Sequence, residues 1–271
     1  MQEWKLSFSF NFNNREIKYD TKGEGEPLIL VHGTPWSSFN LRHLINKLSK
    51  SYKVYYFDLL GYGQSDKKEG DVSLAVQNKV LKELINHWGL VNPYIIGHDF
   101  GGTTVLRSHL LDEVQYKKIV LIDPVAISPW GSAFFKHVEK YEEAFSGVPD
   151  YIHKAIVETY IKTAAHQELD ELTINGILEP WLSENGKEAF YRQIAQANSS
   201  YTDEFQEKFD RVKSDVLILW GEEDKWIPVK QAHKLHSNIK TSKLVTVPNT
   251  GHLVIEEDPT SLYNEITSFF N

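Results

Sequence analysis

Short apolar runs, rich in β-branched and aromatic residues, alternate along the chain with stretches of helical periodicity. The runs occupy residues 27–31, 53–57, 94–96, 119–122, 216–220 and 244–247. Continuous apolar runs separated by helices are typical of parallel strands that are covered on both faces. The pattern therefore predicts an α/β fold in which helices flank a mostly parallel central sheet.

The first part of the chain has a different pattern, in which polar and apolar side chains alternate over residues 4–21 around Asn13 and Asn14. Alternation indicates strands with one face toward water, and paired asparagines suit a tight hairpin turn. We therefore expect an antiparallel hairpin at one edge of the sheet.

The alternation of strands and helices stops for about ninety residues, and residues 125–212 are helical in periodicity throughout, most clearly over 151–165 and 187–197. Pro124, Pro129, Pro149 and Pro180 are expected to separate these helices. A helical block inserted between two strands is best explained as a cap over the carboxyl edge of the sheet, where ligands of such folds bind. The predicted domains are a core of residues 1–124 and 213–271 and a helical cap of residues 125–212.

Composition narrows the possible partners. The 271 residues include no cysteine, so a thiolate metal site and a thiol nucleophile are excluded. With 29 Lys and Arg against 37 Asp and Glu, the chain lacks the basic surface that nucleic-acid binding needs, and nucleic acid is not an expected partner. The sequence shows neither a secretory signal nor an apolar stretch of roughly 18 residues. We therefore expect a cytoplasmic protein without a membrane partner, as a monomer or homodimer.

The strongest candidate for chemistry follows the run 94–96. There Gly97-His98-Asp99-Phe100-Gly101 places an aspartate at the centre of a nucleophile elbow, before a helix expected to start near Thr103. Glycines two positions before and after the central residue allow its strained backbone to pass close to its neighbours. The amino end of the following helix favours negative charge at this point.

Three other loops carry the partners that such a nucleophile needs. Residues 31–36 read Val-His-Gly-Thr-Pro-Trp, residues 221–224 read Gly-Glu-Glu-Asp, and residues 249–252 read Asn-Thr-Gly-His. Each loop follows a predicted strand. The order Asp99, Asp224, His252 is the order of nucleophile, acid and base in α/β-hydrolases. Asp123 also follows a strand and satisfies the same order, so it remains the alternative acid.

Over nearly its whole length the chain resembles α/β-hydrolases of the group that contains haloalkane dehalogenases and epoxide hydrolases. Residues 34–38, 58–66 and 97–101 resemble, in turn, the Asn-Pro-Thr-Ser-Ser, Asp-x-x-Gly-x-Gly-x-Ser-Asp and Gly-His-Asp-Trp-Gly segments of the dehalogenases. The resemblance implies a hydrolase of small-molecule substrates. It also implies that the backbone N–H groups of Thr34 and Phe100 form the oxyanion hole.

An aspartate nucleophile indicates a particular chemistry. Attack by a carboxylate on an sp³ carbon forms an ordinary ester, whereas attack on an acyl carbon would form a reactive anhydride. Asp99 is therefore expected to form an alkyl ester, which His252 hydrolyses by activating water. The expected substrate is small, neutral and mostly apolar.

The bond that is broken is less well defined. Phe100 and Thr34 replace the indole and amide donors that hold the halide in dehalogenases, so another donor is needed. The candidate substrate- or leaving-group-binding residues are Trp36, Trp130, Trp181, Trp226 and, by resemblance to the Tyr-Arg pair of epoxide hydrolases, Tyr191. Haloalkane hydrolysis is the first predicted activity. The alternatives are epoxide hydrolysis, β-lactone opening, and ligand binding by a receptor that has no turnover.

No cofactor or metal is expected. The segment Gly61-Tyr62-Gly63 lacks the further glycine and helix of a dinucleotide site. The acidic residues near strand ends, Asp123 and residues 222–224, have no histidine at the spacing of metal ligands.

Overall fold

Among the described residues, eight strands contain all the apolar runs, and the first two contain the N-terminal alternation from residue 8 onward. The computed structural model describes residues 4–271. The strands are β1 (Phe8–Phe12), β2 (Arg15–Lys22), β3 (Glu26–Val31), β4 (Tyr52–Phe57), β5 (Tyr94–His98), β6 (Lys118–Ile122), β7 (Asp215–Gly221) and β8 (Ser242–Val247). The predicted strand positions are confirmed, with β5 extending two residues further than its apolar run.

The strands form one sheet in the order β1-β2-β4-β3-β5-β6-β7-β8. β1 and β2 form the predicted antiparallel hairpin, which turns at Asn13 and Asn14 with φ angles of 50° and 64°. β2 also pairs antiparallel with β4, whereas the remaining neighbours pair in parallel. The predicted α/β-hydrolase fold class is confirmed.

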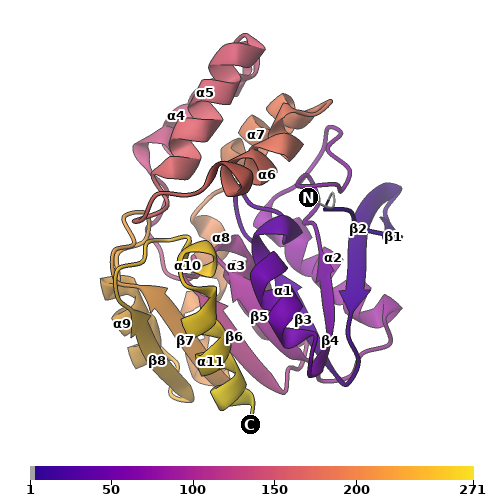
Figure 1. The fold of residues 1–271 in the computed structure, drawn as a ribbon, viewed down its shortest axis with the longest axis vertical. Coiled ribbons are helices and arrows are strands. Elements are labelled where there is room, and N and C mark those ends of the chain that lie inside the picture. Colours follow the sequence, from indigo (N-terminus) through magenta and orange to yellow (C-terminus); the bar gives the residue numbers. More distant parts are fainter. Residues whose placement is uncertain (1–3) are drawn as a thin grey trace.

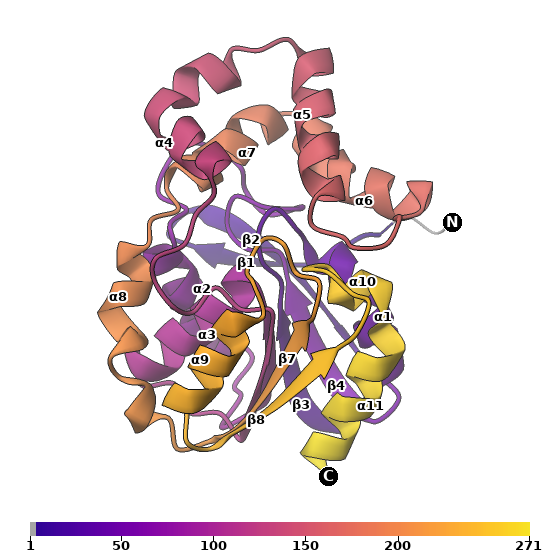
Figure 2. The same ribbon diagram turned by 90° about the vertical axis from the view of Figure 1, so that its left-hand side faces the viewer.

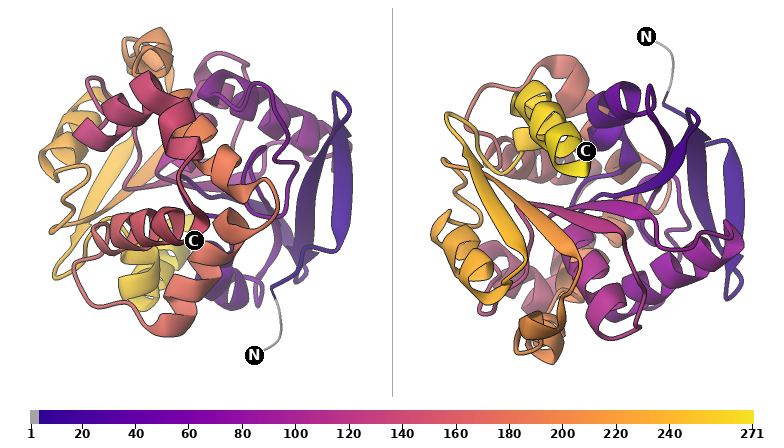
Figure 3. Two further views of the ribbon diagram at one scale, coloured as in Figure 1. Left: turned by 90° about the horizontal axis from the view of Figure 1, so that it is seen from above. Right: turned by 90° about the horizontal axis from the view of Figure 1, so that it is seen from below.

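Helices cover both faces of the sheet (Figures 2 and 3). One face carries α1 (Arg42–Leu48), α10 (Val254–Glu257) and α11 (Pro259–Phe270), and the other carries α2 (Leu74–His87), α3 (Phe100–Leu110), α8 (Ser200–Gln206) and α9 (Lys230–Asn238). Short 3₁₀ helices span Ser38–Leu41 and Phe209–Arg211. Because both faces are covered, the apolar side chains of β3, β5, β6 and β7 form the core of the protein.

Four further helices lie above the carboxyl ends of the parallel strands (Figure 1). These inserted helices are α4 (Ala133–Ser146), α5 (Asp150–Lys162), α6 (Glu171–Leu182) and α7 (Gly186–Ala195). The next helix, α8, lies beside α3, where Arg107 donates a hydrogen bond to Glu204 at 2.8 Å. The domain boundaries proposed from the sequence stay a prediction.

Two local expectations were wrong. The helix after the elbow begins at Phe100, directly behind Asp99, instead of near Thr103. Pro180 does not separate two helices, because it lies inside α6 close to the end at Leu182. Pro180 has no N–H to donate to the carbonyl group four residues earlier, so the helix loses one hydrogen bond there and ends two residues later. None of the described helices is long and apolar enough to span a membrane.

Candidate active site

Asp99 lies on the sharp turn between β5 and α3, as the spacing of glycines predicts. Its backbone angles are φ 53° and ψ −120°, an unfavourable conformation for most residues. A side chain at Gly101 would place Cβ only 2.2 Å from the carbonyl oxygen of Val31, so glycine is required there. The turn presents the Asp99 carboxylate at the carboxyl edge of the sheet, at the amino end of α3.

The Asp99 carboxylate contacts two of the predicted partners. Its Oδ1 accepts a hydrogen bond of 2.6 Å from the backbone N–H of Thr34, and its Oδ2 lies 3.1 Å from Nε2 of His252. A Cβ at Gly33 would lie 2.2 Å from Oδ1, which explains the glycine before Thr34. Phe100 contributes the first N–H of α3, and its role as the second oxyanion donor stays a prediction.

His252 joins Asp99 to Asp224. Nδ1 of His252 lies 2.8 Å from Oδ2 of Asp224, and the other oxygen of Asp224 accepts the backbone N–H groups of Trp226 and Ile227 at 2.7 and 2.8 Å. These two contacts fix the carboxylate in the loop after β7. The three side chains thus form a continuous hydrogen-bonded series in the predicted order.

Asp123 is close to this series but is held differently. One of its oxygens accepts the backbone N–H of Gly221 at 2.9 Å, and the other is buried without a partner among the described residues. Burial, and then the charge of Asp224, raise the pKa of Asp123 well above its usual value. A neutral carboxyl group is a poor partner for an imidazolium ion, so the geometry favours Asp224 as the acid.

Three ligand-type side chains do meet here, contrary to the expectation that the acidic residues lack a histidine. Atoms of Asp123, Asp224 and His252 lie within 4.8 Å of one another. Sequence spacing did not reveal this cluster because the three residues follow three different strands. In this structure Nδ1 of His252 and both oxygens of Asp224 are engaged in hydrogen bonds to each other and to two backbone N–H groups.

The charges around His252 determine its protonation. Burial lowers the pKa of this imidazole, but Asp224 and Asp99 raise it by more, and the net pKa is well above the usual value. This balance favours the imidazolium form of His252, which contacts Asp99 on one side and Asp224 on the other.

Two other histidines hold the loops in place. His98 Nε2 lies 3.0 Å from the carbonyl oxygen of His252, and burial lowers the pKa of His98 to about 4. His32 Nδ1 lies 2.8 Å from the carbonyl oxygen of Gly33, and its Nε2 accepts the N–H of Leu59. Both side chains are buried and position backbone around the triad.

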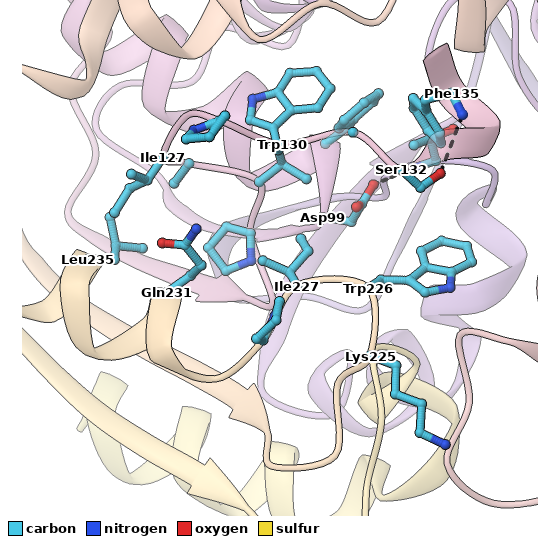
Figure 4. A pocket seen from close by; sticks show the side chains of 18 of the residues that line it. Asp99, Ile127, Trp130, Ser132, Phe135, Lys225, Trp226, Ile227, Gln231 and Leu235 are labelled. Carbon is cyan, nitrogen blue, oxygen red and sulfur yellow. Dashed lines mark hydrogen bonds between the residues drawn. The ribbon is translucent and has the colours of Figure 1, made fainter. Parts of the chain in front are cut away.

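Asp99 opens onto an apolar cavity of about 410 Å³. Figure 4 shows Trp130, Trp226 and Phe135 around Asp99, with Ile127, Gln231 and Leu235 toward the other end. A cavity of this size, with few polar groups, suits a small and mostly apolar molecule.

Only some of the predicted binding residues line this cavity. Trp130 and Trp226 line it, whereas Trp36, Trp181 and Tyr191 do not. Tyr191 is fully buried and its hydroxyl contacts His153 at 3.1 Å. Trp181 donates to the carbonyl oxygen of Pro35 at 2.8 Å. Trp36 stacks on Trp226, with ring centres 5.6 Å apart, and so supports the cavity wall from behind.

Neither lining candidate offers a free indole N–H. Trp130 donates to Thr202 at 2.9 Å, and Trp226 donates to Thr163 at 3.0 Å. Trp226 also stacks on His252, with ring centres 5.1 Å apart. These two residues therefore shape the cavity and shield the triad, and their N–H groups are already used.

Tyr160 is one of five tyrosines in the helical segment that could donate a proton, and the sequence singled out Tyr191 instead. Tyr160 lies on α5, lines the cavity and stacks on Trp226 at 4.5 Å. Its hydroxyl makes no hydrogen bond with the described residues. Burial and then the charge of Asp99 raise the pKa of Tyr160 well above its usual value, so the hydroxyl is a neutral donor.

The fold agrees with comparisons to known proteins. Residues 28–266 match the family described as "Alpha/beta hydrolase family", and the chain belongs to that family. It is 27% identical to the uncharacterized hydrolase YugF of Bacillus subtilis, over 90% of this chain and 89% of YugF. It is 24% identical to epoxide hydrolase 4 of Mus musculus, over 91% of this chain and 73% of that protein.

A solved structure agrees more closely. An alpha/beta hydrolase fold protein from Burkholderia ambifaria is 42% identical, with a TM-score of 0.95 and coverage of 97% of both chains. The family identifies this chain as a hydrolase, and the choice of substrate has to come from the site itself.

Proposed function

We propose that this chain hydrolyses a small, neutral, mostly apolar substrate through an alkyl ester on Asp99. The observation that carries the proposal is the position of the Asp99 carboxylate. It faces the apolar cavity, accepts the N–H of Thr34 and contacts His252, which is backed by Asp224. A carboxylate in this position can attack carbon, and the adjacent imidazole can then activate water.

The first substrate class that we propose is an epoxide, which places epoxide opening ahead of the haloalkane hydrolysis favoured by the sequence motifs. The reason is the state of the polar groups on the aromatic side chains that line the cavity; Ser132, Lys225 and Gln231 line it as well. Tyr160 presents a neutral hydroxyl, whereas the indole N–H groups of Trp130 and Trp226 are bonded to threonines. An opening epoxide needs one proton donor for its oxygen, and Tyr160 supplies it. A departing halide would need donors that these indoles do not offer.

In the first step, an oxygen of Asp99 attacks a ring carbon, a C–O ester bond forms and the ring C–O bond breaks. The ring oxygen takes the proton of Tyr160. Esterification removes the negative charge of Asp99, so the pKa of His252 falls and its proton is lost to solvent, while the Tyr160 phenolate regains a proton from solvent. His252 is then neutral and able to act as a base.

In the second step, His252 takes a proton from water and the hydroxide adds to the Asp99 carboxyl carbon. The N–H groups of Thr34 and Phe100 stabilise the oxyanion that forms. The alkoxide of the product leaves and receives the proton from His252. His252 then takes the proton of the Asp99 carboxylic acid, which restores the ion pair of the free enzyme.

Haloalkanes are the second candidate, because residues 34–38 and 97–101 resemble the dehalogenase segments and the cavity is apolar. In that case the first step forms the same ester bond, breaks the carbon–halogen bond and releases halide, while Tyr160 keeps its proton. His252 then passes its proton to solvent, and ester hydrolysis follows as in the second step above.

A substrate panel combined with one tyrosine variant separates the candidates. Haloalkanes, epoxides and β-lactones are incubated with the enzyme, and halide release and product mass are measured. Tyr160→Phe should lower epoxide turnover by about 10²-fold or more, which is the usual contribution of a positioned general acid. Tyr151→Phe is the matched control, because Tyr151 lies on the same helix and is 74% exposed.

Epoxide turnover that is unaffected by Tyr160→Phe would remove Tyr160 from the mechanism. Halide release without epoxide turnover would make haloalkane hydrolysis the function. Tight binding without any turnover would support the ligand receptor instead.

A further inference from the structure

Gln193 connects the inserted helix α7 to the core beside Asp99. Its side chain is 2% exposed. Its Oε1 accepts hydrogen bonds from Thr34 Oγ1 at 2.6 Å and from the Tyr62 hydroxyl at 2.9 Å. The two donors lie in the loops after β3 and β4, so one buried amide joins three segments that are distant in sequence.

The attachment of α7 to the core does not depend on Gln193. Arg192 donates to the carbonyl oxygens of Lys67 and Lys68 at 2.9 and 3.0 Å. Gln196, just beyond the helix, accepts the N–H of Val72 at 2.7 Å. The docking of α7 therefore has other hydrogen bonds besides those of Gln193. The Nε2 of Gln193 is buried without a partner among the described residues, so keeping this amide inside the protein costs free energy.

Thr34 connects Gln193 to Asp99 by hydrogen bonds. The backbone N–H of Thr34 donates to Asp99 at 2.6 Å, while its side chain donates to Gln193. The N–H and hydroxyl belong to one residue, which follows a glycine. A hydrogen bond that fixes the side chain therefore also fixes the direction of the N–H.

We infer that Gln193 is a positioning residue that holds the oxyanion donor of Thr34 in place from the inserted helix. This inference rests on the proposed ester mechanism. Tyr62 supports the same amide oxygen, and burial keeps its phenol neutral by raising its pKa. Gln193 itself has no contact with Asp99 and does not line the cavity.

The two chemical steps depend differently on this support. During ester formation the negative charge of Asp99 decreases, so a well-aimed N–H contributes little. During ester hydrolysis a full charge develops on the former carboxylate oxygen, and the Thr34 N–H stabilises it. Loss of Gln193 should therefore slow hydrolysis of the ester and leave its formation nearly unchanged.

The test compares Gln193→Met, which keeps the length of the side chain, with Thr34→Val, which keeps the backbone N–H and removes the hydroxyl. Rapid quenching and intact-protein mass spectrometry give the rates of ester formation and decay, with a panel epoxide or haloalkane that the parent enzyme turns over. Each variant should slow ester decay by about tenfold, a fraction of the 10²- to 10³-fold lost with an oxyanion donor. Ester formation should change by less than about threefold.

The double variant identifies the route of the effect. Because both changes break the same hydrogen bond, their combination should be no worse than about twofold beyond either single variant. Arg192→Met is the matched control on α7, and it should leave the ratio of the two rates unchanged. Gln193→Glu, which keeps an oxygen acceptor when protonated, should recover most of the rate of decay.

Four results would overturn the inference: equal slowing of both steps, multiplication of the two single effects in the double variant, the same change of ratio in Arg192→Met, or no recovery in Gln193→Glu. If the Gln193→Met chain fails to fold, the ratio of the two rates in Gln193→Glu and Thr34→Val decides the matter. Absence of any ester in the parent enzyme is a separate result, and it would refute the proposed function on which the inference rests.

Discussion

Replacing His252 by Gln should convert the enzyme into a trap that keeps its substrate as an ester. Asp99 retains its 2.6 Å hydrogen bond from Thr34 and its place at the amino end of α3 in this variant. Only the contact of 3.1 Å with His252 is removed. Attack at carbon needs no base, so ester formation should stay within about tenfold of the parent rate.

Ester hydrolysis depends on His252 much more strongly. General-base catalysis contributes about 10²- to 10⁴-fold, and Gln cannot take a proton from water. For a parent that turns over at about 10 per second, the ester in the variant would decay at on the order of 0.1 to 0.001 per second. The modified protein would then persist for seconds to many minutes.

Intact-protein mass spectrometry measures the trapped species directly. With an epoxide the protein should gain the whole mass of the substrate, and with a haloalkane the mass of the alkyl group. Peptide mapping should place the addition on the segment that contains Asp99. His233→Gln, at an exposed position of α9, is the control, and its ester should be transient and decay at the parent rate.

An unmodified His252→Gln protein would refute this reasoning, provided that the parent enzyme turns over the same substrate. So would modification that survives replacement of Asp99 by Asn, because the ester would then belong to another residue.

Further predictions concern the acidic residues beside His252. Because His252 contacts Asp224 at 2.8 Å, Asp224→Asn should slow ester decay by about 10²- to 10⁴-fold. Asp123→Asn should slow it by less than about tenfold. A larger loss with Asp123→Asn would reverse the assignment of the acid. Asp99→Asn removes one of the charges that raise the pKa of His252, so the pKa measured by NMR should fall, and an unchanged value would contradict the ion pair. The folded protein raises the pKa of Asp123, so protonated Asp123 adds to the free energy of unfolding below its unfolded pKa of about 4. As pH rises toward the raised pKa, this contribution is lost by up to about 1.4 kcal/mol per pH unit. The melting temperature of Asp123→Asn relative to the parent should therefore increase from pH 5 to pH 8, and a constant difference would show that Asp123 is ionised.

The residues that could be predicted from sequence are those whose position depends on local loops. Asp99, Asp224 and His252 each follow a strand of a parallel sheet, and such loops meet at one edge of the sheet. The order along the chain therefore identified them. Chain order could not choose between Asp123 and Asp224, because that choice depends on which carboxylate faces Nδ1 of His252 in three dimensions.

The residues of the inserted helices could not be predicted in the same way. Tyr191 and Tyr160 both lie on helices with mixed faces, but Tyr191 turns toward His153 and Tyr160 toward the cavity. The difference arises from how the helices pack on the core, and the periodicity of apolar residues along a helix does not predict that packing. Gln193 offered one signal, because it is a polar residue on the buried face of α7 beside Ile194.

The most direct test of the central claim is a single turnover in water labelled with oxygen-18, with enzyme in excess over substrate. If Asp99 attacks carbon, the oxygen added to the first product comes from the Asp99 carboxylate, and the label enters the protein at that residue. The account predicts an unlabelled first product and a labelled Asp99 peptide. A labelled first product with an unlabelled peptide would show that water attacks the substrate directly, and it would contradict the ester mechanism.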